Sequence, residues 1–355
     1  MATRRHSDHR ANGLSEREEL VLRSIVQHFI LTANPVGSRF LSKRFEEESL
    51  SAATIRNTMA DLEEKGLISH PHTSAGRVPT DRGYRLYVDT LMVDVGLSDQ
   101  ERATIRRNIV GSGATPVLMR EAARLVAHIS KQLGIVTAPE ILDGILARIE
   151  LVPLSSVRLL LVLAIEKSII RTITLEVHEC YEREGLDTLV AVLNERLCGF
   201  TLRDIRNSLA ERLQGVIDPD GLVKLLVERS NTIFAPPDEI ERVQVSPAGS
   251  IFDQPEFATP EQLRGIVELI ENEEMVIHLL DRRGHDAEEG NVEIAIGSEI
   301  GDERLADYSM ITTRYRIGST TGTIGLIGPR RMNYSRMRTV VDYIARTITK
   351  NFEGS

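Results

Sequence analysis

Tryptophan is absent from the chain, and aromatic residues make up only 4% of its 355 residues. Proteins that bind single-stranded nucleic acid stack the bases on aromatic side chains, so this composition argues against such a platform. Long apolar runs are also missing: the longest, residues 159–165, is seven residues long and too short to cross a membrane. No apolar segment follows the basic N-terminal residues, so we expect no secretory signal and a cytoplasmic protein.

Cysteine is scarce as well. Cys180 and Cys198 cannot build a disulfide framework or a four-cysteine metal site. The groups 70–72 and 178–180 contain histidines, but neither has the second ligand pair that a closed tetrahedral site needs. The glycine-rich segment 318–328 lacks a phosphate-binding motif, and the chain has no Gly-x-Ser-x-Gly or His-Glu-x-x-His sequence. We therefore expect a protein that is not an enzyme and needs neither cofactor nor metal.

The charge is distributed unevenly along the chain. The formal net charge is −9, yet residues 1–92 hold 13 basic and 12 acidic residues, so the excess of acid lies in the rest. The segment 66–88 carries Arg77, Arg82 and Arg85 against Asp81 alone. Such a strip can contact a phosphate backbone because charges act over a Debye length of about 8–10 Å. On charge alone, a solvated surface with scattered arginines is the alternative.

The first fifty residues have the signals of two helices. Ser15 and Glu18 have the spacing of a capping box, and an apolar stripe follows at helical spacing. Asn34-Pro35 predicts the end of this helix, because the residue before proline avoids the helical region. We expect Ser38 to cap a short second helix that ends near Phe45.

A third helix is predicted over residues 51–65, with Ser51 as its cap and Gly66 after its end. Helical periodicity places Ile55, Met59 and Leu62 on its buried face. Its outward face over the first two turns then holds Ala53, Arg56 and Asn57, whereas its acidic residues lie in the C-terminal half. Arginine and asparagine make bidentate contacts to guanine and adenine, so this face is typical of a recognition helix. A surface helix of a small bundle is the alternative.

Residues 67–70 and 77–79 can form two short strands around a turn at 71–76, and a helix follows from Thr80. Three helices followed by a β-ribbon predict a winged helix-turn-helix domain, whose ribbon is suited to lie along a phosphate backbone. We expect duplex DNA to be contacted by ten residues: Ser38, Ser51, Ala53, Thr54, Arg56, Asn57, His72, Thr73, Ser74 and Arg77.

These segments also resemble the HrcA-type heat-inducible transcription repressors of bacteria. The resemblance rests on Pro35-Val36-Gly37-Ser38, on Ser51-x-x-Thr54-Ile55-Arg56-Asn57-x-Met59-x-x-Leu62-Glu63-x-x-Gly66, and on His70-Pro71-His72-Thr73-Ser74-x-Gly76-Arg77-Val78-Pro79-Thr80-x-x-Gly83-Tyr84-Arg85. Similar motifs follow at 252–257, 296–299 and 325–334, so it extends from Leu14 over nearly the whole chain. It implies a homodimer that binds an inverted-repeat operator upstream of chaperonin and DnaK operons. It also implies the chaperonin GroEL as a modulator that keeps the repressor in its active fold.

Beyond residue 95 the pattern alternates between helices and strands. Strands are predicted at 145–152, 157–165, 169–177, 292–300, 309–317 and 320–327, and one of the predicted helices includes Leu133. Small isolated sheets are marginal in water, so we expect both groups of strands to complete one sheet. The predicted class is α+β, with a flexible leader (1–13), a winged-helix domain (14–95) and a second α+β domain interrupted by a mainly helical insertion. The family resemblance implies that the second domain is GAF-like, in two segments (98–180 and 290–352), and that the insertion (181–289) is a dimerisation domain.

Two other functions stay open at this point. The winged helix could dock on another protein instead of DNA, in which case binding would lack the steep salt dependence of phosphate contacts. A GAF-like domain could also sense a small ligand for another set of genes, which thermal stabilisation by that ligand would reveal.

Overall fold

The computed structural model describes residues 13–45, 50–71, 76–111, 115–165, 169–177, 181, 183–218, 221–235, 242–257, 259–284 and 290–353. Within them helices are combined with three antiparallel sheets, in agreement with the predicted α+β class. None of the helices in these ranges is long and apolar enough to span a bilayer. The predicted leader, apart from Gly13, lies outside the described residues.

The N-terminal part comprises three helices, a two-stranded ribbon and a fourth helix. In chain order these are α1 (Glu16–Thr32), α2 (Ser38–Arg44), α3 (Ala52–Glu64), β1 (Ile68–Ser69), β2 (Val78–Pro79), α4 (Asp81–Leu86) and the π-helical turn η1 (Tyr87–Leu91). Val36, between α1 and α2, forms a β-bridge with Arg77 and so ties the ribbon to the helices. The order of elements is the one expected from the sequence.

Local capping signals explain most helix starts. Ser15 and Glu18 form the predicted capping box of α1, and the Ser51 hydroxyl accepts a hydrogen bond from the Thr54 amide at the start of α3. The prediction for Ser38 is wrong. Gly37 is the N-cap of α2 without a side-chain cap bond, and Ser38 is already the first helical residue. The extended backbone of Gly37 lets the helix begin one residue earlier than a serine cap would.

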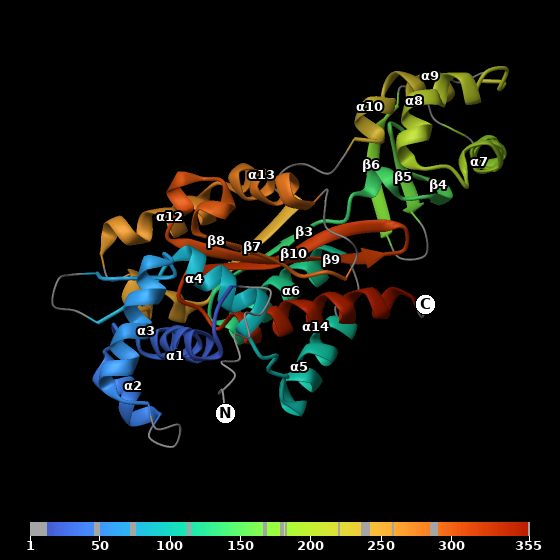
Figure 1. Cartoon of the computed structure of the whole chain (residues 1–355). Helices are drawn as coiled ribbons and strands as arrows, with labels where there is room; N and C mark the ends of the chain where they lie inside the picture. Colours follow the sequence, from blue (N-terminus) through green and yellow to red (C-terminus); the bar gives the residue numbers. More distant parts are fainter. Residues whose placement is uncertain are drawn as a thin grey trace.

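The central body is a five-stranded antiparallel sheet between two layers of helices (Figure 1). The strand order is β7 (Val243–Pro247), β3 (Leu133–Thr137), β10 (Thr320–Pro329), β9 (Tyr308–Ile317), β8 (Glu293–Ile296). Helices α6 (Thr115–Ser130) and α14 (Tyr334–Glu353) cover one face, with α5 (Asp99–Val110) packed on both. The opposite face packs on α12 (Pro260–Glu271) and α13 (Glu273–Gly284) through a separate apolar cluster that includes Ile266 and Val276. Short helical turns complete the body at Gly249–Asp253, Pro255–Phe257, Gly297–Ile300 and Glu303–Leu305.

A second lobe lies at the far end of the molecule from α2 and α3 (Figure 1). It holds a three-stranded sheet and four helices: β4 (Leu146–Ser155), β5 (Arg158–Ile165), β6 (Ile169–Glu176), α7 (Arg183–Leu197), α8 (Leu202–Arg212), α9 (Leu222–Glu228) and α10 (Ser230–Ile233), preceded by the turn Ile141–Asp143. Helix α7 packs on β4, and one face of the sheet is buried.

The expectation that the two groups of strands complete one sheet is wrong. Within the described ranges, strands β4–β6 pair only with each other, and the partners that extend the C-terminal strands are β3 and β7. The three-stranded sheet is stabilised because its buried face packs against helices of its own lobe. Residues 243–247 form a single strand, β7, and residues 260–271 and 273–284 form the two helices α12 and α13.

The assignment of Leu133 to a helix is also wrong. Helix α6 ends at Ser130, Lys131 adopts a left-handed backbone conformation, and Leu133 begins β3. The side chain of Leu133 is fully buried. An apolar residue at this spacing is buried equally well by a helix or a strand, so periodicity alone could not distinguish the two.

Candidate nucleic-acid interface

The exposed face of α3 is the one expected from the sequence. Ala53, Arg56 and Asn57 are exposed, whereas Ile55, Met59 and Leu62 are buried. Thr54 is half-buried, and the Ser51 hydroxyl lies 2.9 Å from the Thr54 hydroxyl and 3.1 Å from its amide nitrogen. The hydroxyl of Ser51 therefore stabilises the helix start, and the first two turns present a small side chain, a guanidinium and an amide to solvent.

Helix α2 adds a feature that sequence reasoning missed. It packs on α3 and exposes three cations, Arg39, Lys43 and Arg44, while the predicted contact residue Ser38 is half-buried at its start. Neither α2 nor the first turn of α3 contains an acidic residue. The cations occur in the sequence Ser38-Arg39-Phe40-Leu41-Ser42-Lys43-Arg44, which is a detectable signal once α2 is known to lie beside α3.

Arg77 lies at the base of the ribbon. Its Nη2 is 2.9 Å from Glu63 Oε2, and His70 Nδ1 contacts the other oxygen of the same carboxylate. Arg77 also exchanges two backbone hydrogen bonds with Val36, each 2.9 Å long. The guanidinium thus holds the ribbon to the C-terminal half of α3. The predicted contact residues His72, Thr73 and Ser74 lie outside the described residues.

The basic strip over residues 66–88 is largely neutralised. Arg85 pairs with Glu299, with its Nε 3.0 Å from Glu299 Oε1, and with Asp89 four residues later in η1. Arg77 is paired with Glu63, so only Arg82 of the three arginines remains exposed. The exposed positive charge of the N-terminal part therefore lies more on α2 and at Arg56 than on this strip.

A close backbone approach fixes the ribbon against α4. A Cβ built on Gly83 would lie 2.0 Å from the Leu67 carbonyl oxygen, so only glycine fits here. The Thr80 hydroxyl caps α4 by accepting from the Gly83 amide at 3.1 Å, and it donates to the Gly66 carbonyl at 2.7 Å. The end of α3, the ribbon and α4 are thereby joined into one unit.

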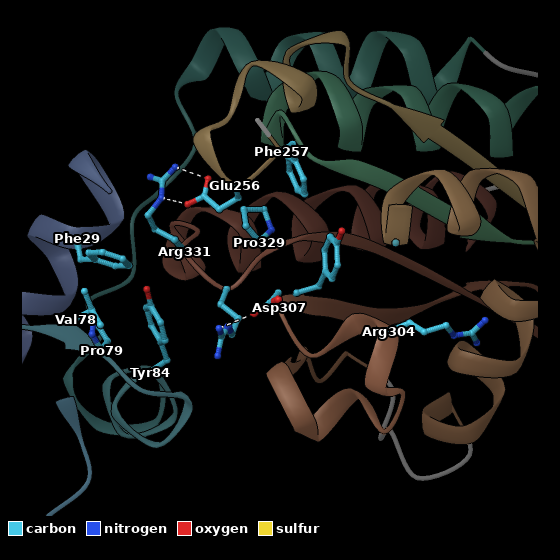
Figure 2. A pocket seen from close by; sticks show the side chains of 13 residues that line it. Phe29, Val78, Pro79, Tyr84, Glu256, Phe257, Arg304, Asp307, Pro329 and Arg331 are labelled. Carbon is cyan, nitrogen blue, oxygen red and sulfur yellow. Dashed lines mark hydrogen bonds and ion pairs between the residues drawn. The ribbon is translucent and has the colours of Figure 1, made fainter. Parts of the chain in front are cut away.

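This unit is held to the body by ion pairs and hydrogen bonds. Arg330 Nη1 lies 2.7 Å from Asp81 Oδ1, and its Nη2 lies 2.7 Å from Asp307 Oδ1. Arg331 pairs with Glu256 and donates to the Ile30 carbonyl at 2.5 Å (Figure 2 shows the pair with Glu256). These contacts join α1 and α4 to the segment after β10, more than two hundred residues away, and so fix how α3 is presented.

No group of three or more potential ligand side chains that could hold a metal ion occurs within the described ranges. Cys198, whose pKa is raised by burial, is a free thiol beside Asn194. Cys180 and the group 178–180 lie outside the described residues.

The family model and the curated relatives name the same family. Residues 117–337 match the family model of the HrcA protein C-terminal domain. Heat-inducible transcription repressor HrcA of Chlorobium phaeobacteroides (strain BS1) is 39% identical over 340 residues, which cover 94% of this chain and 96% of that protein. The same repressor of Prosthecochloris aestuarii is 37% identical over 347 residues, or 96% and 98% of the two chains.

A crystal structure of a hypothetical protein has a similar fold, with a TM-score of 0.63 and 24% identity, and the match covers 96% of this chain and 99% of that one. The resemblance noted in the sequence is thus confirmed over nearly the full length, and the chain belongs to the HrcA family.

Proposed function

We propose that this chain is a heat-inducible repressor of chaperone genes that binds an inverted-repeat operator as a homodimer. The observation that carries the proposal is the outward face of α3, where Ala53, Arg56 and Asn57 are exposed in the first two turns. Side chains at the start of a recognition helix reach base edges, and arginine and asparagine discriminate bases there. The family membership supports this function, because the relatives are named as heat-inducible transcription repressors.

The N-terminal part acts as a winged helix in this proposal. Arg56 and Asn57 read bases, with Ala53 and Thr54 beside them. Ser38 and Ser51 lie at helix starts where backbone amides can also face phosphates. The exposed cations of α2 contact the phosphate backbone, and the ribbon, with His72, Thr73, Ser74 and Arg77, lies along the duplex.

Binding to DNA containing an inverted repeat from upstream of a chaperone operon of the source genome, measured by fluorescence anisotropy, tests these roles. We expect Arg56→Ala to weaken binding about 5- to 100-fold and to relax preference at one base pair. Lys43→Ala should weaken binding to all sequences and lower the salt slope by about 1. Arg107→Ala, which removes an exposed arginine from α5 of the body, is the charge-matched control and should change neither. Unchanged affinity and base preference in Arg56→Ala would show that α3 does not read DNA.

The domain organisation is part of the proposal. We infer a winged helix over 14–95 and a GAF-like domain around the five-stranded sheet. The boundaries 98–180, 181–289 and 290–352 remain predictions, and the strand pairing favours an insertion that begins after β3 and ends before β7. In this arrangement the inserted dimerisation domain is the lobe of β4–β6 and α7–α10.

The free face of the three-stranded sheet supports dimerisation through this lobe. Residues alternate between the two faces of a strand, and on β5 the buried residues are Leu159, Leu161, Leu163 and Ile165. The opposite face carries the half-buried residues Leu160, Val162 and Ala164, with exposed Val152 and Ile170 on the flanking strands. Arg148, Glu150, Thr172 and Thr174 lie on the same face, so it combines exposed apolar side chains with polar ones, as protein–protein contacts do.

A charge on that face tests the dimer. Ile170 is 71% exposed, so a glutamate is tolerated by the monomer but would be buried without a partner in the dimer. We expect Ile170→Glu to raise the dimer dissociation constant at least about tenfold, measured by analytical ultracentrifugation. Val110→Glu, at a position 63% exposed on α5, is the control. An unchanged dissociation constant in Ile170→Glu would place the dimer contact elsewhere.

The family resemblance further implies modulation by the chaperonin GroEL. Since a change of about 1–2 kcal/mol in stability alters the folded fraction several-fold, a marginally stable repressor would lose operator binding when heat diverts the chaperonin to other clients. Operator binding after mild heating should therefore recover faster with GroEL, GroES and ATP than with ATP alone. Equal recovery would argue against this partner.

A further inference from the structure

A cavity of about 360 Å³ lies between the N-terminal part and the body (Figure 2). Phe29 of α1, Pro79 of β2 and Tyr84 of α4 line it on one side. Phe257, Tyr308 and Arg330 line it on the other. Five of its thirteen lining residues are charged and the other eight are apolar, glycine or tyrosine, and cavities of this size commonly hold small molecules.

The hydroxyl of Tyr84 is a polar group in the wall of this cavity. Tyr84 is only 3% exposed, and among the described residues its hydroxyl has no hydrogen-bond partner. Leaving a buried hydroxyl without a hydrogen bond is unfavourable, so such groups usually have an explanation in function. In Figure 2 this hydroxyl points away from α4 into the space between Phe29 and Arg331. Burial raises the pKa of Tyr84 well above its ordinary value, so the group is a donor at physiological pH.

The charged residues of the cavity are already paired. Arg330 lies between Asp81 and Asp307, and Arg331 is held by Glu256 and the Ile30 carbonyl. Arg304, at the far end, pairs with Asp302. An ionic ligand would have to displace one of these partners. The remaining walls are apolar and aromatic, with the rings of Phe257 and Tyr308 stacked at 5.9 Å.

We propose that this cavity is a binding site for a small uncharged molecule with a planar apolar body and one hydrogen-bond acceptor, which accepts from the Tyr84 hydroxyl. The molecule would contact α1, β2 and α4 on one side and the body on the other, and would stabilise one orientation of α3 relative to the body. This regulatory consequence rests on the proposed DNA-binding function, whereas the binding site itself does not.

Acetophenone and ethylbenzene are suitable probes, because they have similar shapes and differ in one carbonyl acceptor. Binding to the full-length protein without DNA is followed by chemical-shift changes in protein NMR spectra. We expect saturable binding of acetophenone with a dissociation constant of about 1 mM, typical of so small a ligand. Ethylbenzene should bind roughly 2- to 10-fold more weakly, since it lacks one hydrogen bond.

Tyr84→Phe keeps the ring and removes the donor, so acetophenone should then bind no better than ethylbenzene. Tyr343→Phe is the matched control, because the Tyr343 hydroxyl on α14 is also buried without a hydrogen-bond partner in the described part of the chain but does not line the cavity. It should leave both affinities unchanged. Two outcomes would overturn the proposal: no saturable binding of acetophenone, or a preference for acetophenone that survives in Tyr84→Phe.

The proposed DNA-binding function can be separated from this result. If acetophenone binds through Tyr84 but the chain does not bind an operator, the proposed ligand site is supported and the proposed regulation of DNA binding is refuted. If both hold, saturating acetophenone should change operator affinity in the unmodified protein and leave it unchanged in Tyr84→Phe.

Discussion

Gly297 packs so closely on Asp81 that a Cβ built on the glycine would lie 2.3 Å from the Asp81 Oδ2 atom. Gly297 follows β8 of the body, and Asp81 begins α4, so this contact joins parts of the chain that are far apart in sequence. Arg330 holds the same carboxylate from another side. The start of α4 is thus fixed between two elements of the body.

Substitution of Gly297 should therefore be more destabilising than backbone strain alone predicts. Gly297 has φ +56°, and Gly301, four residues later, has φ +83° with open space around it. We expect Gly301→Ala to lower the free energy of unfolding by about 1 kcal/mol through strain only. Gly297→Ala adds the clash with Asp81 and should cost about 2–3 kcal/mol in urea denaturation. If the two variants lose the same free energy of unfolding, the Asp81 side chain moves away from the added methyl group without an energetic penalty.

The Asp81–Arg330 pair should contribute little by itself. Both side chains are about one third exposed, 31% and 39%, so solvent screens their attraction. A double-mutant cycle with Asp81→Asn and Arg330→Gln should give a coupling of about 0.5–1 kcal/mol. The cycle with Asp307→Asn in place of Asp81→Asn serves as control, because Asp307 is 85% exposed and should couple more weakly. A larger coupling of Arg330 with Asp307 than with Asp81 would contradict the expectation that the less exposed pair is coupled more strongly.

Glu63 should control the stability of the ribbon. The Glu63 carboxylate contacts His70 and forms an ion pair with Arg77, whose side chain is only 20% exposed. Glu63→Gln leaves that guanidinium without its anionic partner, so amide hydrogen exchange at Ile68 and Ser69 should become about tenfold faster. Glu64→Gln, at the exposed neighbouring position, should leave exchange unchanged. If the two variants behave alike, the ribbon is held by its backbone bonds alone.

Acid should destabilise the N-terminal part through Glu18. Burial alone would raise the pKa of Glu18, but hydrogen bonds from Lys65 and Ser15 outweigh it, and the pKa lies below its ordinary value. A carboxyl with a lowered pKa in the fold stabilises the fold above its unfolded pKa, and this contribution is lost as the pH falls through the folded pKa. The melting temperature should therefore fall as the pH drops below about 4.3.

Glu18→Gln isolates that contribution. At pH 7 it should lower the free energy of unfolding by about 1–2 kcal/mol, because Lys65 Nζ loses an ion-pair partner at 2.6 Å. The loss should shrink in acid, where the unmodified glutamate is protonated as well. The exposed Glu184→Gln should show neither effect. A loss that stays constant with pH would exclude an electrostatic role for Glu18.

Features decided by neighbouring residues were predictable from the sequence. The capping box of Ser15 with Glu18 was predicted and is present, because a cap involves residues three apart. The exposed and buried faces of α3 followed from helical periodicity for the same reason. The family resemblance, which rested on mixed polar, glycine and proline positions, was confirmed by the relatives.

Features decided by distant residues were not predictable. Which strands pair depends on what covers each sheet, and α7 covers β4 within the second lobe. The ion pair of Arg77 with Glu63 depends on the packing of the ribbon on α3, which the sequence pattern did not predict. The sequence alone did not show that the cations of α2 belong to the candidate interface, because this depends on the contact between α2 and α3. None of these contacts leaves a periodic signal in the sequence.

The neighbouring positions of β3 and β7 have one more consequence. Thr137 and Val243 are register partners, and the Ala138 amide donates to the Arg242 carbonyl at 2.7 Å, so the chain leaves and re-enters the central sheet at a single point. A segment whose two ends already meet can be exchanged for a short turn without changing the strands that it joins. The second lobe can therefore change in size without altering the strand order of the central sheet, and a smaller version of the protein can be made by joining residues 137 and 243 through a short turn, at the cost of the proposed dimer contact.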